Sequence, residues 1–239
     1  MRKVYQIYLR VCYTYQMIKL IIFDWDDVFS LGSKEGYFKC YQAVLDETGV
    51  TLDADEKRKR ILQHWGQPYH HAIDELLREK PELRKKGYEI YQKNLLGDTF
   101  VDCLHIIPSA RELLLHLDKQ YTLAVASGVQ PKLLKDRIFP KFNIPDVFTE
   151  IITAHDLDDS SKSKPHPFIA EEIMRRTKIR KEETVMVGDA KNDVLMAQNA
   201  GITPIVVLTG HLDRQEAEAL KVKYIIKDVT EIEDVLKKL

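Results

Sequence analysis

The stretch "KLIIFDWDDVFS", residues 19–30, runs four apolar residues directly into three carboxylates, Asp24, Asp26 and Asp27. A short run that is apolar on both faces is typical of a strand buried in a parallel sheet. Carboxylates packed this closely cost free energy unless a positive charge lies among them. The stretch therefore predicts a buried strand that ends in a cluster of carboxylates. This cluster requires a positively charged group close to it.

Similar apolar runs recur later in the chain, and helical patterns separate them. The further candidate strands are residues 122–127, 184–189 and 203–208, with weaker ones at 150–152 and 224–226. The candidate helices are residues 108–117, 167–177 and 193–200. This alternation of strand and helix predicts an α/β fold with a doubly wound, mostly parallel, Rossmann-like sheet.

One long segment interrupts the alternation after the first strand. In residues 34–102, the apolar positions Tyr37, Tyr41 and Leu45 fall on one helical face. We predict a helical bundle here, inserted between two parts of the core, residues 17–33 and 103–239. Ligands of open α/β sheets bind at the carboxyl ends of the strands, so an insertion that leaves from that edge can cover the site as a lid.

Composition limits the class of protein. The 239 residues are 44% apolar, enough for a core, and the formal net charge is -1. A near-neutral chain has no overall field to attract nucleic acid or an anionic membrane, so neither is an expected partner. The three cysteines, Cys12, Cys40 and Cys103, are odd in number and widely spaced. They argue for a reducing, cytoplasmic location and against disulfides or a zinc site.

The first 16 residues permit two interpretations. Arg10 and Lys19 interrupt any apolar run, so the segment makes neither a signal peptide nor a spanning helix. Met17 lies just before the first strand, and it is a candidate natural start with residues 1–16 as an upstream extension. The alternative is an edge strand or a short helix that docks on the core.

Polar residues follow the predicted strands at the points where they end. They are Asp24 and Asp26, Ser127 and Gly128, Lys164, and Asp189 with Asp193. Because the carboxyl ends of parallel strands meet at one edge, these groups are expected to converge. A divalent metal held by Asp24 and Asp189 would screen the repulsion among these carboxylates, and a ligand set of oxygens suits Mg²⁺.

These motifs together resemble the haloacid dehalogenase-like (HAD) superfamily. The DxD motif is met by Asp24-Trp25-Asp26, the strand that ends in Ser or Thr by Ser127, the KPxP motif by residues 164–167, and GDxxxD by residues 188–193. Each motif alone is weak, but all four occur in order at strand ends. The resemblance runs from about residue 18 to the end, and the helical insertion matches the family's small α-helical cap.

The resemblance implies a role for each residue of the motifs. Asp24 would attack phosphorus and form an aspartyl-phosphate. Asp26 would protonate the leaving oxygen and later take a proton from the hydrolytic water. Ser127, Gly128 and Lys164 would bind the phosphoryl oxygens and stabilise the charge of the transition state.

The resemblance also implies the metal ligands and the class of reaction. Mg²⁺ would be held by Asp24, the backbone carbonyl of Asp26, Asp189 and, through water, Asp193. Dehalogenases lack the second aspartate of the first motif, and phosphonate hydrolases usually carry alanine there. Asp26 therefore favours phosphoryl transfer with a protonated leaving group.

The resulting hypothesis is a Mg²⁺-dependent phosphatase of a small phosphorylated metabolite, with phosphoglycolate as the default substrate. The subgroup that it resembles also contains sugar phosphomutases of the β-phosphoglucomutase type, which are the first alternative. A non-catalytic phosphoryl-binding or regulatory protein is the second. The expected partner is a small-molecule phosphate ester, and the expected state is a monomer or homodimer.

Within the insertion, the segment "HWGQPYHHA", residues 64–72, groups glycine, aromatic and histidine residues. A loop that lines the substrate is the favoured interpretation, through Trp65, Gly66, Tyr69 and His70. A metal site formed by His64, His70 and His71 is the weaker alternative.

Several positions near the motifs need a separate interpretation. Lys164 is favoured over Lys162 for phosphate because it stands where the motif requires, and His166 either points into the site or only shapes the loop. The "DLDD" string at residues 156–159 is interpreted as a solvated loop with capping or turn roles. Asp27 stands where relatives usually have glycine, and Asp tolerates positive φ better than most residues.

Overall fold

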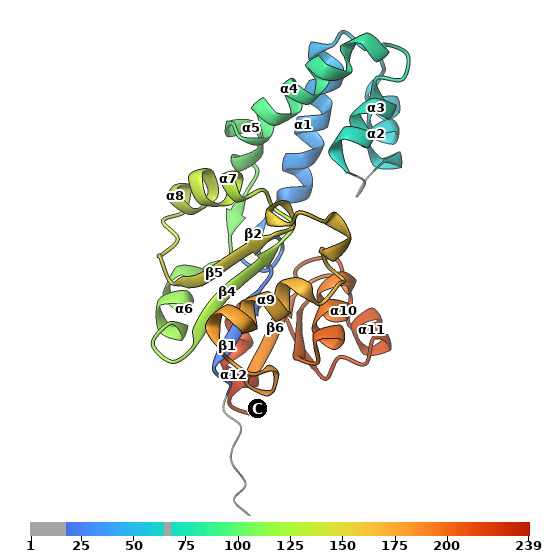
Figure 1. Ribbon diagram of the computed structural model, residues 1–239. Helices are drawn as coiled ribbons and strands as arrows, with labels where there is room; N and C mark the ends of the chain where they lie inside the picture. The colour runs from blue at the N-terminus through green and yellow to red at the C-terminus, as the bar shows by residue number, and fades with distance from the viewer. Residues whose placement is uncertain (1–17, 65–67) are drawn as a thin grey trace, which may run out of the picture.

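The computed structural model describes residues 18–64 and 68–239 of the chain. The segment interpreted as an N-terminal extension, together with Met17, Trp65 and Gly66, lies outside the described residues. Among the described helices, none is long and apolar enough to cross a membrane. Figure 1 shows a sheet covered by helices, with a group of helices above one edge of that sheet.

The sheet has six parallel strands, and the first strand of the chain lies at its centre. The spatial order is β5 (Phe148–Thr153), β4 (Thr122–Ser127), β1 (Leu20–Phe23), β6 (Thr184–Gly188), β7 (Thr203–Val207) and β8 (Tyr224–Ile226). β1 pairs with β4 on one side and with β6 on the other. The predicted doubly wound parallel sheet is confirmed, and both weaker strand candidates form strands.

The side chains of β1 alternate between two apolar layers. Ile21 and Phe23 enter one layer, and Leu20 and Ile22 enter the other. The first layer includes residues of α6 (Ala110–Leu117) and α12 (Ile232–Leu236); the second includes residues of α9 (Phe168–Thr177) and α10 (Lys191–Ala200). Burial on both faces explains why the strand carries no polar residue.

Shorter elements complete the core. They are α7 (Pro131–Leu133), a π-helical turn (Leu134–Ile138), α8 (Phe139–Lys141), α11 (Arg214–Ala219), and 3₁₀ turns at Ala154–Asp156, Ser160–Lys162, Lys181–Glu183 and Val229–Glu231.

The insertion is helical throughout its described part. It contains α1 (Ser33–Glu47), α2 (Ala54–Gln63), α3 (Tyr69–Leu76), a 3₁₀ turn (Pro81–Leu83), α4 (Arg84–Leu95) and α5 (Asp98–Val101). The chain leaves and re-enters the core through an antiparallel ribbon of β2 (Ser30–Leu31) and β3 (His105–Ile106). Gly32 has φ 95°, and a Cβ there would lie 2.1 Å from the carbonyl oxygen of Cys103, so only glycine fits this crossing.

Two ion pairs join the base of the insertion to the core. Asp98 lies 2.5 Å from Arg137, and Asp102 pairs with Lys141. Arg137 and Lys141 belong to the helical segment that follows β4. Cys40 and Cys103 are buried free thiols, in agreement with a packing role.

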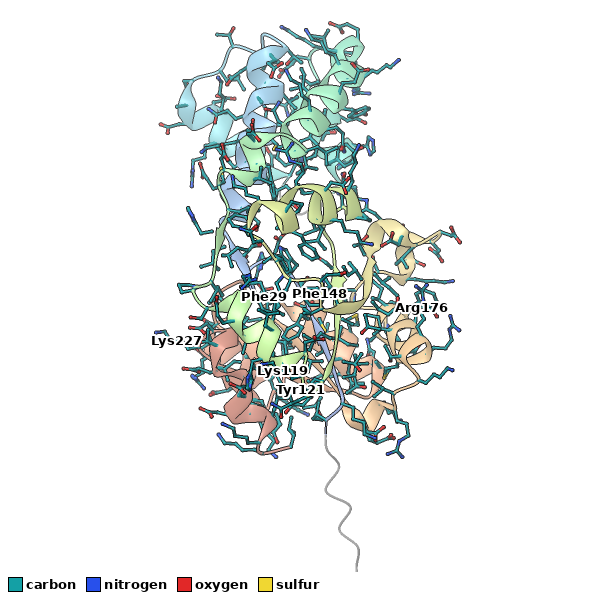
Figure 2. The ribbon with its side chains drawn as sticks, turned by 90° about the vertical axis from the view of Figure 1, so that its left-hand side faces the viewer. Phe29, Lys119, Tyr121, Phe148, Arg176 and Lys227 are labelled. Carbon is teal, nitrogen blue, oxygen red and sulfur yellow. The ribbon has the colours of Figure 1, made fainter. Side chains whose placement is uncertain are left out.

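An aromatic cluster packs beneath the carboxyl end of β1. Trp25 is fully buried. The centre of its ring lies 5.4 Å from the ring centre of Phe29, 4.8 Å from that of Phe139 and 6.4 Å from that of Phe148. Figure 2 labels Phe29, which is fully buried, and Phe148, which is partly buried and packs against the same core. The cluster turns Trp25 into the core, between Asp24 and Asp26, which are less completely buried.

Candidate active site

The carboxyl ends of the central strands meet at the edge of the sheet that the helical insertion overlies (Figure 1). Asp24 extends the pairing of β1 with β6, because its N–H donates to the carbonyl of Val187 at 2.8 Å. Its Oδ1 accepts the N–H of Trp25 at 2.7 Å, which fixes the orientation of the carboxylate. The side chain of Asp26 accepts a hydrogen bond from the Ser30 hydroxyl at 3.3 Å.

Lys164 lies between two of the predicted carboxylates. Its Nζ is 3.0 Å from Oδ1 of Asp24 and 2.6 Å from Oδ1 of Asp193. The side chain of Lys164 is 11% exposed, that of Asp24 is 14% exposed and that of Asp193 is 2% exposed. Burial acts to lower the pKa of Lys164, but the carboxylates of Asp193 and Asp24 outweigh it and raise that pKa above its ordinary value.

Lys162 occupies a different environment from Lys164. It is exposed, and its ammonium group lies 4.9 Å from the centre of the Phe168 ring. The loop that carries Lys164 is held to α10 by Asn199, whose amide donates to the carbonyl of Pro165 at 3.0 Å. His166 is exposed, and its Nδ1 accepts the N–H of Phe168, so the ring takes part in shaping the loop. The structure brings Lys164, and not Lys162, to the other motif residues.

The carboxylates raise one another's pKa values. Burial is the main reason that the pKa of Asp24 rises to about 7; Lys164 opposes it, and Asp193 and Asp189 add to it. Burial also raises the pKa of Asp26 to about 8, with further contributions from Asp24 and Asp27. Five carboxylates therefore gather at this edge of the sheet, whereas only Asp24 and Asp193 contact Lys164, and the raised pKa values reflect burial and this mutual repulsion.

Ser127 and Gly128 stand at the carboxyl end of β4. Ser127 is buried, and its Oγ accepts the backbone N–H of Val129 at 3.2 Å. Gly128 is exposed, and a Cβ at this position would meet no atom within 4 Å. Gly128 thus lies at an open surface beside a fixed hydroxyl, and a backbone amide and a hydroxyl at a strand end are groups that can bind an anion.

Asp189 follows β6 and is held by a residue that the motifs did not identify. Its Oδ2 accepts two hydrogen bonds from His211, one from the backbone N–H at 2.9 Å and one involving Nδ1 at 2.8 Å. Asp189 is 2% exposed, whereas the His211 side chain is mostly exposed. His211 lies in the loop after β7, at the same edge of the sheet, but a lone histidine with no acidic residue between it and the strand gives no chemical signal in the sequence.

Asp27 has the backbone conformation that the sequence suggested. Its φ is 56°, in the left-handed region that glycine adopts without steric cost. Its carbonyl accepts a hydrogen bond from the Thr209 hydroxyl. Burial and the nearby Asp189 raise the pKa of the Asp27 carboxyl, while His211 and Lys34 oppose the rise.

The helical insertion also contributes to the environment of the site. Tyr37, on α1, packs against Phe100 with the ring centres 4.7 Å apart. Burial is the main cause that raises the pKa of the Tyr37 phenol, and the charge of Asp26 raises it further. An aromatic side chain of the insertion therefore lies within electrostatic range of the carboxylates.

The chemistry of the donor atoms fits a hard divalent cation. Asp24, Asp189 and Asp193 each offer a carboxylate oxygen, and these atoms lie within 4.8 Å of one another. Both oxygens of Asp193 already accept hydrogen bonds, from Lys164 and from the N–H of Ala190. Asp24 and Asp189 are thus better placed as direct ligands, and an all-oxygen set suits Mg²⁺. Asp27, Asp189 and His211 form a second such group.

The predicted substrate loop is only partly described. Tyr69 and His70 begin α3, and the Tyr69 ring stacks on Tyr91 at 5.0 Å. A role for them in substrate binding stays a prediction. Among the described residues, the groups placed to hold a metal do not include His64, His70 or His71.

The "DLDD" string has the local roles predicted for it. Asp156 accepts hydrogen bonds from the backbone N–H and the hydroxyl of Thr153 and so caps a 3₁₀ turn. Asp159 accepts those of Ser161 and caps the next turn. The string is a capped surface loop.

Comparison with known proteins gives a consistent picture. The family model for haloacid dehalogenase-like hydrolases matches residues 21–207. The glyceraldehyde 3-phosphate phosphatase of Methanothermobacter thermautotrophicus is 30% identical over 92% of this chain and 97% of that protein. The phosphoglycolate phosphatase of Vibrio vulnificus is 26% identical over 65% of this chain and 66% of that protein, just under two thirds of its length.

Solved structures share the fold at lower identity. A HAD-superfamily hydrolase from Geobacter sulfurreducens has a TM-score of 0.70 at 22% identity, and the match covers 92% of this chain and 96% of that chain. A predicted phosphoglycolate phosphatase from Haemophilus somnus has a TM-score of 0.71 at 20% identity, with coverage of 93% and 99%. At these identities the likeness shows the fold alone.

Proposed function

The chain belongs to the haloacid dehalogenase-like hydrolases, and we propose that it is a phosphatase that hydrolyses the phosphate monoester of a small metabolite. The observation that carries this proposal is the buried contact of Asp24 with Lys164, 3.0 Å apart, with Asp26 two residues further on. A carboxylate nucleophile, a second carboxyl group and a fixed cation are the side chains that this reaction needs.

Asp24 and Asp26 both act in each of the two steps of the reaction. An oxygen of Asp24 attacks phosphorus, the bond from phosphorus to the ester oxygen breaks, and an aspartyl-phosphate forms. Asp26 gives its proton to the leaving oxygen, so that a neutral alcohol departs. Water then attacks the phosphorus, Asp26 takes its proton, and inorganic phosphate leaves as the Asp24 carboxylate is restored.

Three other residues bind the phosphoryl group. Lys164 supplies a positive charge beside the attacking oxygen, where negative charge accumulates in the transition state. The Ser127 hydroxyl and the Gly128 amide lie at the end of the neighbouring strand β4 and donate to phosphoryl oxygens. Ser127 is held in place by its hydrogen bond from Val129, so its donor position is set before the substrate arrives.

We propose Mg²⁺ as the cofactor of this site. Asp24 and Asp189 would supply carboxylate ligands, the backbone carbonyl of Asp26 a further oxygen, and Asp193 would act through water because Lys164 and Ala190 already occupy its oxygens. When bound, the ion would neutralise charge between the carboxylates and the phosphate.

The names of the relatives suggest which substrates to test first. One is a phosphoglycolate phosphatase and another a glyceraldehyde 3-phosphate phosphatase, and both names denote phosphates of short carbon chains. We therefore propose a short-chain phosphate, with phosphoglycolate as the default. The absence of nucleic-acid and membrane partners, a monomeric or homodimeric state and a cytoplasmic location stay predictions.

The test is a phosphate-release assay with Mg²⁺ over a panel of metabolite phosphates and a generic aryl phosphate. We expect turnover by the wild type and only background release by Asp24→Asn, because an amide cannot act as the nucleophile. Asp158→Asn is the matched control, since Asp158 is an exposed acid of the look-alike string. The assignment of Asp24 is wrong if Asp24→Asn retains turnover.

Two further outcomes would decide between the proposed function and its alternatives. If the wild type releases no phosphate from any member of the panel, the phosphatase proposal fails. Incubation with β-glucose 1-phosphate and a bisphosphate primer tests for a mutase, which would form the 6-phosphate without net release of phosphate.

A further inference from the structure

The loop that follows β7 wraps around Asp189. The backbone N–H of Leu212 donates to the Asp189 carbonyl at 2.9 Å, and His211 donates to its side chain. Thr209, at the start of the loop, donates to the carbonyl of Asp27. One short segment, residues 209–212, thus fixes both the main chain and the side chain of a predicted metal ligand.

The contacts are confined to one oxygen of the Asp189 carboxylate. Both hydrogen bonds from His211 reach Oδ2, at 2.9 and 2.8 Å. In residues 18–64 and 68–239, no hydrogen bond to Oδ1 is found. The backbone of Gly210 packs against the same oxygen, because a Cβ at this position would lie only 1.9 Å from Oδ2 of Asp189. The carboxylate is therefore held by one oxygen while the other is left for a ligand.

We propose that His211 is a positioning residue, which holds Oδ2 of Asp189 so that Oδ1 is presented to the divalent metal ion. This inference rests on the proposed function, because it requires a metal at Asp24 and Asp189. For Nδ1 to donate, it must carry a proton of the imidazole. A donor of this kind orients a metal ligand and strengthens metal binding without touching the ion.

The alternative role for His211 is that of a ligand in a second metal site. Asp27, Asp189 and His211 offer three ligand atoms within 4.8 Å. The geometry favours the donor role, because the backbone N–H and the ring of His211 converge on the same oxygen at hydrogen-bond distances. The number of ions bound per chain separates the two roles.

The experiment measures binding of Mg²⁺ and Mn²⁺ by calorimetry, with no substrate present. We expect His211→Ala to weaken the affinity by about tenfold, at the lower end of such effects because the backbone N–H remains. His211→Asn places an amide N–H near the position of Nδ1, so its affinity is expected within about threefold of the wild type. His211→Gln, whose amide reaches toward the Nε2 position, is expected to weaken binding as the alanine variant does.

A matched control and an independent substitution accompany the series. His116 pairs with Glu233 at 3.0 Å on a helix outside the site, so His116→Ala breaks a similar contact and is expected to leave metal affinity unchanged. Gly210→Ala inserts a methyl group against Oδ2 and is expected to weaken metal binding at least as much as His211→Ala. If His211→Ala does not fold, the comparison of the Asn and Gln variants decides.

Several results would overturn the inference, and they can be told apart from failure of the proposed function. Equal affinity in the wild type and His211→Ala removes the positioning role, as does loss of affinity in His211→Asn. A fall from two bound ions to one in the alanine variant makes His211 a ligand. A wild type that binds no divalent ion refutes the metal site itself, whereas a wild type that binds metal without releasing phosphate refutes only the catalytic proposal.

Discussion

Lys164→Met is expected to destabilise the protein strongly, whereas the same change two residues earlier is expected to do little. Lys164 is 11% exposed and contacts Asp193 at 2.6 Å and Asp24 at 3.0 Å. Unit charges about 3 Å apart attract by about 5 kcal/mol at an effective dielectric constant of about 20, before the cost of desolvation is subtracted. Methionine keeps most of the side-chain volume, so the loss of charge dominates the effect.

The net magnitude follows from what the substitution leaves behind. Without Lys164, the carboxylates of Asp24 and Asp193 stay buried and lose their common cation. Removal of one partner from a buried ion pair costs about 3–5 kcal/mol, mainly because the remaining charge is uncompensated. We therefore expect a loss of about 3–5 kcal/mol in the free energy of unfolding. Lys162 is exposed over the Phe168 ring, and Lys162→Met is expected to cost at most about 1 kcal/mol.

The assay is urea denaturation of each variant in the presence of a chelator. A cycle with Asp193→Asn separates the ion pair from general packing, because part of the cost of Lys164→Met should disappear once Asp193 is neutral. A coupling energy of about 1–3 kcal/mol is expected for groups in direct contact. The reasoning is refuted if Lys164→Met and Lys162→Met are equally stable, or if the cost of Lys164→Met is the same with and without the Asp193 charge.

Two further predictions concern the core. Hydrogen bonds from Arg180 and Lys19 lower the pKa of Glu183 to about 2 from its ordinary 4.5. Because the folded-state pKa lies below the unfolded one, the stabilisation is present above about pH 4.5 and is lost as the pH falls toward 2, so Glu183→Gln should flatten the dependence of Tm on pH in this range. Trp25 is fully buried, and its Nε1 has no hydrogen-bond partner among the described residues. Trp25→Phe removes that unpaired donor and is expected to cost less than about 2 kcal/mol in urea denaturation, against about 3–5 kcal/mol for Trp25→Ala; equal losses would contradict this.

The sheet and its strand ends could be predicted because their signals are local. The four apolar residues before Asp24 form a strand that is buried on both faces, and the same holds for residues 184–188. A parallel sheet then brings the residues after these strands to one edge without any further information. The helices of the insertion were predictable for the same reason, because apolar residues that recur every three or four positions form one face of a helix.

The individual contacts within the site could not be predicted from such signals, although the convergence of the strand ends could. Lys164 and Asp193 are 29 positions apart, and Asp189 and His211 are 22 apart. Each contact depends on how an irregular loop lies against another part of the chain, since Lys164 reaches Asp193 on α10 and His211 reaches Asp189 after β6. Periodicity carries no information on that. His211 also follows a strand that ends in Val207, with no acidic residue between them. A lone histidine in a loop gives no chemical signal until the structure places it against a carboxylate.

Asp27 illustrates how a local rule and a long-range contact act on one residue. The loop after β1 has to reverse so that Asp24 and Asp26 stay at the site while Trp25 and the residues after Asp27 are buried, and the left-handed φ of 56° at Asp27 belongs to that reversal. Glycine is the usual solution, since it adopts this conformation without steric cost. Aspartate is the better-tolerated replacement, but it adds a fifth carboxylate to the site. The added charge lies next to His211, which opposes the rise of the Asp27 pKa. The loop after β7 therefore reaches both acids: Thr209 donates to the Asp27 carbonyl, and His211 contacts Asp189 and lies within 4.8 Å of a carboxylate oxygen of Asp27. A chain with glycine at this position would lack the Asp27 carboxylate, and His211 would then lie beside the Asp189 carboxylate alone.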